Sequence, residues 1–209
     1  MTLAINIEKT ETVIEQLVQS IEAALPRGPR LAAIGSARFW HKDSEATCIQ
    51  IGKLVAGLPG LVLITGGVAG VGEAVGYSFY QARKSSGRAP HVYHILPRGY
   101  PRWDYGDTLF AGSDMNERCE VLGRLSRLYV AIEGGPGTEH EAGVARSRDA
   151  TVIPVGRSGG VSAKMYEQIG PPPTIDGQCW NILGAVDSTP EQTAKAVVCV
   201  VKSSLELGT

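Results

Sequence analysis

The segment from Arg127 to Arg146, RLYVAIEGGPGTEHEAGVAR, restricts the fold of this chain more than any other. Leu128 to Ile132 is a short run of β-branched and aromatic residues, which predicts a buried strand. Three glycines within 134–137 predict a tight turn, and Thr138 is a suitable N-cap for a following helix. A strand, a glycine turn and a helix N-terminus form an anion site, because free N–H groups and the positive end of the helix dipole converge there. We therefore place a phosphate at this turn.

The same residues have a purely structural interpretation. Thr138-x-x-Glu141 has the spacing of a capping box, in which Glu141 returns to the backbone N–H of the cap residue. Glycine-rich turns between strand and helix are also common in α/β proteins that bind nothing there. Spacing alone does not separate the two interpretations.

Length and composition favour one domain with a sizeable core, because the chain has 209 residues and 26 glycines. A formal net charge of −1 gives no electrostatic reason to expect a nucleic-acid or membrane partner. The N-terminus resembles neither a signal peptide nor a membrane span. The cysteines form no C-x-x-C pair and no metal-ligand spacing, so we expect reduced thiols, no metal and a cytoplasmic location. They are Cys48, Cys119, Cys179 and Cys199.

Strand-like and helix-like patterns alternate along the chain. Strands are predicted at 31–34, 61–65, 91–96, 128–132 and 152–155. Helices are predicted at 7–25, 44–57, about 71–84, 115–125, 139–148 and 190–205, with a short helix before Pro171 and a loop at 174–179. This order predicts a single-domain, Rossmann-like α/β fold, in which a parallel sheet carries helices on both faces. The core should span about residues 30–160, between helical flanks.

Glycine turns follow four of the five predicted strands, at 35, 66–72, 134–137 and 156–160. The carboxyl ends of parallel strands share one edge of the sheet, and ligands bind in the crevice outside that edge. The coincidence favours the phosphate interpretation of Gly134 to Thr138 over the capping box.

A long segment at 98–113 has no predicted element, although it contains Trp103 and Tyr105. Irregular segments of this length are often lids over a site. The alternative is a surface excursion that its aromatic side chains anchor.

Two spaced motifs resemble those of a known family. Met115-Asn116-Glu117-Arg118 and the later run GGPGTEHE at 134–141 are similar to the paired M-x-x-R and P-G-G-x-G-T-x-x-E signatures of the Lonely Guy (LOG) proteins. These are cytokinin riboside monophosphate phosphoribohydrolases that were long mislabelled as lysine decarboxylases. The wider superfamily includes molybdenum-cofactor carriers and sensors of ADP-ribose-type nucleotides. The resemblance covers about residues 30–160.

The resemblance implies that Arg118 and Glu141 form a catalytic pair that cleaves the N-glycosidic bond of a purine nucleoside 5′-monophosphate. A carboxylate beside the ribose would stabilise its developing positive charge, and an arginine would hold the phosphate or polarise the leaving base. The residues expected around the phosphate and nucleotide are Gly35, Ser36, Gly66, Gly67, Gly70, Met115, Gly134, Gly135, Gly137 and Thr138. For Arg118, the alternative is an exposed helix residue paired with Asp114 or Glu120.

Two departures from the family pattern favour a second function, in which the crevice carries or senses a nucleotide-like ligand without cleaving it. Glu133 stands where the family has proline, so an extra carboxylate lies near the expected phosphate. Cys119 replaces a lysine and removes a cation; we interpret it as a half-buried thiol and not a nucleophile.

The resemblance also implies a homodimer whose site is completed across the interface. No cofactor is expected.

Three other chemistries fit less well. A pyridoxal-phosphate decarboxylase needs a Schiff-base lysine, but all seven lysines lie away from the glycine turns. A P-loop needs G-K-[ST], whereas Gly52-Lys53 is followed by Leu54. A dinucleotide-binding dehydrogenase needs G-x-G-x-x-G after its first strand, where this chain has Gly35-Ser36-Ala37-Arg38.

Overall fold

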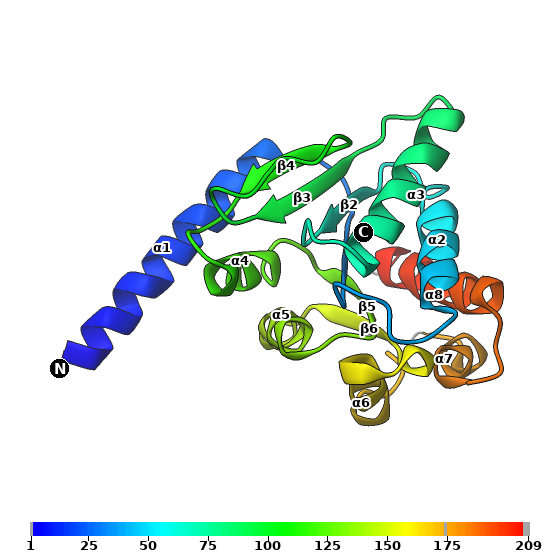
Figure 1. Ribbon diagram of the computed structural model, residues 1–209. Helices are drawn as coiled ribbons and strands as arrows, with labels where there is room; N and C mark the ends of the chain where they lie inside the picture. Colours follow the sequence, from blue (N-terminus) through cyan, green and yellow to red (C-terminus); the bar gives the residue numbers. More distant parts are fainter. Residues whose placement is uncertain (1, 174, 207–209) are drawn as a thin grey trace.

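A parallel sheet between two layers of helices forms the body of the molecule in a computed structural model, which describes residues 2–173 and 175–206 (Figure 1). Side chains are described for residues 11–173 and 175–205, so the predicted helix-face residue Ile7 lies outside them. The Rossmann-like α/β fold predicted from the sequence is therefore confirmed. No helix in these described ranges is long and apolar enough to cross a membrane.

The sheet that the described residues form has six strands in the order β4-β3-β2-β1-β5-β6, and every neighbouring pair is parallel. Ala32 at its centre pairs with Ile64 on one side and with Tyr129 on the other. The strands are β1 (Arg30–Gly35), β2 (Val62–Thr65), β3 (Val92–Leu96), β4 (Asp107–Phe110), β5 (Leu128–Ile132) and β6 (Thr151–Val155). All five predicted strands are present, and β4 is an additional strand at the sheet edge.

Helices cover both faces of the sheet because the strands are apolar on both sides. On β1, Leu31 and Ala33 face one core cluster and Ala32 and Ile34 face the other. The first cluster packs against α2 (Ser44–Val55), α3 (Val71–Ser85), α7 (Gly177–Gly184) and α8 (Pro190–Glu206). The second packs against α1 (Thr2–Ala24), α4 (Met115–Leu122), α5 (Pro136–Ser147) and α6 (Gly160–Gln168). A short 3₁₀ turn, η1 (Gly156–Ser158), precedes α6.

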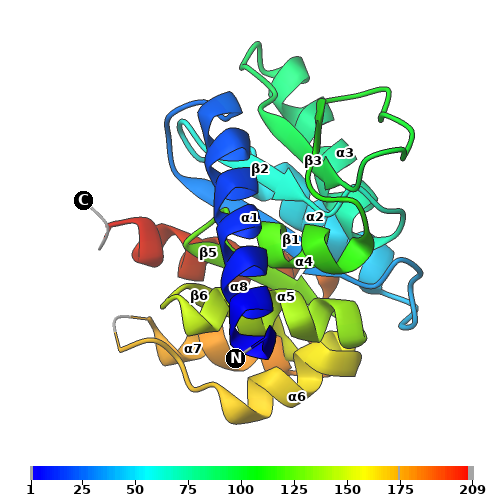
Figure 2. The same cartoon turned by 90° about the vertical axis from the view of Figure 1, so that its left-hand side faces the viewer.

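The first helix packs on the flank of the domain, as its apolar periodicity predicts. Ile14, Val18 and Ile21 are buried against the second core cluster. At the end of α4, Arg124 makes ion pairs with Glu11 and Glu15 of α1. Figure 2 shows α1 lying over the helical layer that contains α4 and α5.

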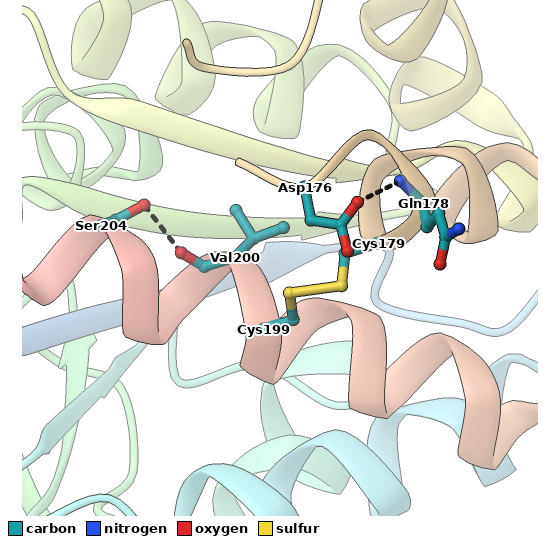
Figure 3. Close-up of a disulfide and its surroundings, with 6 residues drawn as sticks. All are labelled: Asp176, Gln178, Cys179, Cys199, Val200 and Ser204. Atoms are coloured by element: carbon teal, nitrogen blue, oxygen red, sulfur yellow. Dashed lines mark hydrogen bonds between the residues drawn. A yellow bond between two sulfur atoms is a disulfide. The ribbon is translucent and has the colours of Figure 1, made fainter. Parts of the chain in front are cut away.

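Two expectations for the C-terminal part of the chain are wrong. The segment predicted as a loop at 174–179 contains the start of α7, which begins after Asp176 because the carboxylate of this residue accepts from the Gln178 amide. Cys179 on α7 and Cys199 on α8 form a disulfide, whereas reduced thiols were expected (Figure 3). The packing of α7 against α8 brings the two residues together, and their separation of 20 positions carries no recognisable motif. Cys48 and Cys119 are free and buried.

Candidate functional site

The crevice lies where the strand order reverses. From β1 the chain proceeds through β2, β3 and β4 on one side and then returns to place β5 and β6 on the other. All strands are parallel, so the loops after β1, β2, β5 and β6 lie at the same edge, and the reversal between β1 and β5 marks the place where sheets of this kind bind ligands. We refer to this place, beyond the ends of β1 and β5, as the crevice. The predicted glycine turns at 35, 66–72, 134–137 and 156–160 all come at the ends of strands β1, β2, β5 and β6, and so begin at this edge.

The β5–α5 turn differs from the sequence prediction in its helix start. Helix α5 begins at Pro136 with Gly135 as its N-cap, whereas Thr138 was expected to be the cap. Proline is well suited to the first helical position, because its φ is fixed near the helical value and it lacks the N–H that would stay unpaired there. Thr138 therefore lies buried inside the first turn, and the Thr138–Glu141 capping box does not form.

Glu133 is completely buried at the end of β5, and its carboxylate is turned into the β1–α2 loop. It accepts hydrogen bonds from the Ser36 hydroxyl and from the backbone N–H groups of Trp40 and His41, the last two at 2.9 Å. The backbone N–H of Glu133 donates to Ser158 Oγ at 2.7 Å. Three donors within the protein therefore hold this carboxylate against the β1–α2 loop, and its expected effect on a bound phosphate stays a prediction. The hydroxyl of Ser36, one of the residues expected around the ligand, is one of these donors.

Arg118 and Glu141 form a buried ion pair between α4 and α5. Arg118 Nη1 donates to Glu141 Oε1, and the two side chains are only 3% and 7% exposed. Asp114 caps α4 through the amides of Asn116 and Glu117, which fixes the start of the helix that carries Arg118. The alternative of an exposed Arg118 paired with Asp114 or Glu120 is wrong.

The β2–α3 loop closes over this ion pair. Arg118 Nη2 donates to the carbonyl of Gly66 at 3.0 Å, and a Cβ at Gly66 would lie 2.9 Å from that nitrogen. A side chain at position 66 would therefore displace the guanidinium from this contact. Gly70 packs against the β1–α2 loop near Ser36, and Gly35 packs against β5. Met115 lies half-buried in the first turn of α4.

Burial controls the ionisation of this cluster. Desolvation raises the pKa of the Glu141 carboxyl, and the nearby Arg118 guanidinium opposes that effect. Desolvation, followed by the Glu141 charge, raises the pKa of the Cys119 thiol to about 12. Cys119 therefore remains protonated at neutral pH, in agreement with the prediction that it is not a nucleophile. Within the part of the chain that the structure describes, Arg118 Nε has no hydrogen-bond partner.

The 98–113 segment is anchored by aromatic side chains, which matches the second of the two predicted alternatives. Trp103 Nε1 donates to the Gly67 carbonyl at 2.8 Å, and Tyr105 is buried with its hydroxyl on the Glu73 carbonyl. Both rings contact His94 of β3, and the segment then forms the edge strand β4. The segment thus contacts the β2–α3 loop through Trp103 and α3 through Tyr105.

The predicted site residues do not include Trp40, an exposed residue of the β1–α2 loop. Its ring lies close to Gly135 and Gly160, and its exposed fraction is 59%. In the sequence, the signal for this residue is its position five residues after a strand that ends in glycine. Glu133 was noticed as a departure, but its role in holding the β1–α2 loop could not be read from the sequence.

Hollows also lie away from the β5–α5 turn. One of about 630 Å³ runs between α2 and α3. Another, of about 1070 Å³, lies at the amino ends of the strands, and a third, of about 550 Å³, lies between the end of α2 and α8. None of these three is lined by Arg118, Glu141 or the β5–α5 turn, so the candidate site rests on the sheet topology and on the contacts described above.

The fold and the crevice define an α/β protein of the Rossmann-like class with its candidate site at the switch point of a parallel sheet. The model of the SLOG cluster4 family matches residues 29–172, and the chain belongs to this family. The predicted resemblance to the LOG superfamily is thereby confirmed. No curated protein matches the chain.

Solved structures share the fold. The X-ray structure of TM1055, a structural genomics target, is 24% identical, with a TM-score of 0.58 over 73% of this chain and 89% of that one. The molybdenum cofactor binding protein from the phototrophic bacterium Rippkaea orientalis is 22% identical, with a TM-score of 0.56 over 84% of this chain and 98% of that one. At these identities the likeness establishes the fold alone.

Proposed function

We propose that the protein binds a phosphorylated, nucleotide-like ligand in the crevice between β1 and β5, and that it hydrolyses the N-glycosidic bond of a purine nucleoside 5′-monophosphate. The observation that carries this proposal is the Arg118–Glu141 pair. Two residues 23 positions apart come together at the ligand edge, on the two helices where the family motif places its catalytic residues.

The first step is capture of the phosphate. The amide groups at the start of α5 point out of the helix end, where the dipole favours an anion. The turn is rich in glycine, and a side chain at Gly137 would meet no atom within 4 Å, so the helix end is open to a ligand.

The second step is stabilisation of the ribosyl cation. Thr138 and Glu141 are three residues apart and both buried, so they share one face of α5, directly beyond the phosphate position. A carboxylate there would offset positive charge that develops on the ribose, and it would orient a water molecule. Arg118 would hold the carboxylate in place through its hydrogen bond.

A direct assay tests the enzymatic proposal. The protein is incubated with AMP and with an N6-substituted AMP, and free base and ribose 5-phosphate are measured. We expect both products in equal amounts. Release no faster than in buffer for either substrate would contradict hydrolysis.

The second candidate is a non-catalytic carrier or sensor, and the burial of the ion pair favours it. Both carboxylates near the crevice are engaged inside the protein, Glu133 by the β1–α2 loop and Glu141 by Arg118. The solved structure from Rippkaea orientalis is described as binding the molybdenum cofactor, so a pterin ligand is one case of this function. Thermal-shift measurements with AMP, ADP-ribose, NAD and a pterin separate the candidates. Stabilisation by AMP alone, followed by its hydrolysis, would exclude the carrier function.

We also propose a homodimer whose site is completed across the interface, as the family resemblance implies. Tyr77 on α3 is half exposed and supplies apolar surface beyond the core. Light scattering at micromolar concentration should give twice the mass of the 22.1 kDa chain. A clean monomer would contradict the proposal.

A further inference from the structure

Trp40 is exposed to solvent and yet fixed in position. Its exposed fraction is 59%, but its backbone N–H donates to the buried carboxylate of Glu133 at 2.9 Å, and the next N–H, that of His41, does the same. The loop around the tryptophan is thus held by charge-assisted hydrogen bonds inside the protein. An exposed large aromatic side chain on an ordered loop indicates a binding surface more strongly than an isolated surface leucine does, because it presents a preorganised apolar face to solvent.

The indole ring lies against glycine backbone at the crevice. A Cβ at Gly160 would come within 2.7 Å of Trp40 Cζ3, and one at Gly135 within 3.7 Å of its Cη2. The ring therefore extends from the β1–α2 loop to both the β5–α5 turn and the start of α6. Gly160 also has a φ of 62°, so a side chain at this position would be strained as well as crowded.

Most of the ring is open to solvent. A tryptophan that merely filled a gap in the core would be enclosed, whereas 59% of this side chain is exposed. The arrangement is an exposed aromatic ring that lies against Gly135 and Gly160, beside the N-terminus of α5.

We propose that Trp40 is the surface on which the planar nitrogen heterocycle of the ligand, a purine or a pterin, stacks. This inference rests on the proposed function and adds the residue that recognises the ring, which neither Arg118 nor the glycine turn provides. Any aromatic heterocycle has a π-face that can stack on an indole ring. Trp40 would therefore raise the affinity for ligands that carry such a base above the affinity for sugar phosphates that lack one.

The test compares two ligands that differ in the presence of the aromatic base. Binding of AMP and of ribose 5-phosphate is measured by calorimetry for the wild type, Trp40→Ala and Trp40→Phe. We expect Trp40→Ala to weaken AMP binding by about 5- to 150-fold, the range that base–aromatic stacking supports, and to leave ribose 5-phosphate unchanged. Trp40→Phe should retain most of the AMP affinity. AMP should quench tryptophan emission in the wild type, and that quenching should be lost in Trp40→Phe although AMP still binds.

Tyr100→Ala is the matched control, because Tyr100 is a similarly exposed aromatic residue, at 46%, that the proposed function does not place in the site or at the interface. It should leave the affinity for AMP unchanged. Equal AMP affinity in the wild type and Trp40→Ala would overturn the inference while the proposed binding function stands. Equal weakening of AMP and ribose 5-phosphate would also overturn it, because the variant would then act on the loop and not through stacking. If the wild type binds neither AMP nor a pterin, the proposed function fails together with the inference.

Discussion

Arg118 on α4 donates a hydrogen bond to Glu141 on α5, and the same guanidinium donates to the carbonyl of Gly66 after β2. One arginine therefore joins the loop of a central strand to two helices. Because both charged side chains are almost completely buried, each compensates the charge of the other inside the protein.

The pair should show strong energetic coupling. Glu141→Gln and Arg118→Met should each lower the free energy of unfolding by roughly 3 kcal/mol, because each leaves an uncompensated buried partner. The double variant should lose much less than the sum. Urea unfolding of all four proteins measures the coupling. Additive losses would show that the two residues act independently, contrary to the structure.

Glu133 should be essential for the β1–α2 loop. Glu133→Gln keeps the size but weakens three hydrogen bonds to a carboxylate, so we expect a loss of roughly 1–3 kcal/mol. Hydrogen exchange should accelerate at the amides of Trp40 and His41. Glu139→Gln, an exposed carboxylate on α5, is the control and should change neither quantity. Unaltered exchange at residues 40 and 41 in Glu133→Gln would rule out this anchoring role.

The disulfide should stabilise the C-terminal helices. Cys179 and Cys199 are 20 positions apart, and closing a loop of this length contributes about 3 kcal/mol in the chain-entropy model. Reduction should lower the free energy of unfolding by this amount, and Cys179→Ser with Cys199→Ser should do the same. Added reductant should have no further effect on the double variant. If reductant leaves the wild type unchanged, the bridge does not contribute to stability.

His94 should make stability depend on pH. It is fully buried, bonded to Thr65 Oγ1 and the Tyr105 carbonyl, and burial lowers its pKa to about 4 from an unfolded value near 6.5. The folded state favours the neutral ring, so this contribution is complete above pH 6.5 and is lost as the pH falls toward 4. We expect the free energy of unfolding to drop by roughly 2 kcal/mol between pH 7 and pH 5. His94→Gln should have a smaller pH dependence in urea titrations; an identical slope would contradict the assignment.

The central sheet and the proximity of Arg118 to Glu141 could be predicted from the sequence. Strongly apolar strands such as Leu128–Ile132 were recognisable from local pattern, and the motif spacing placed Arg118 and Glu141 together. The sequence did not predict the elements whose formation depends on tertiary contacts. The edge strand β4 is short and lies in a segment whose aromatic residues pack on His94, and α7 follows three prolines that suggested a loop. The start of α5 was misplaced because proline at its first position outweighs Thr138 as a cap.

The anchoring role of Glu133 could not be predicted from the sequence. The sequence does not show that Ser36 and two amides five to six positions after Gly35 surround its carboxylate. Glu133 has a positive φ of 55°, and its side chain points into the loop after the neighbouring strand. This contact exists because β1 lies beside β5 in the sheet.

The rate of base release from AMP by Glu141→Gln, compared with the wild type and Glu139→Gln, tests the central claim most directly. The three proteins are assayed at a temperature at which circular dichroism shows each of them folded. Our account predicts release of base and ribose 5-phosphate by the wild type and Glu139→Gln, and a loss of at least about 100-fold in Glu141→Gln, because a neutral amide cannot offset charge on the ribose. Full turnover by folded Glu141→Gln would contradict the account.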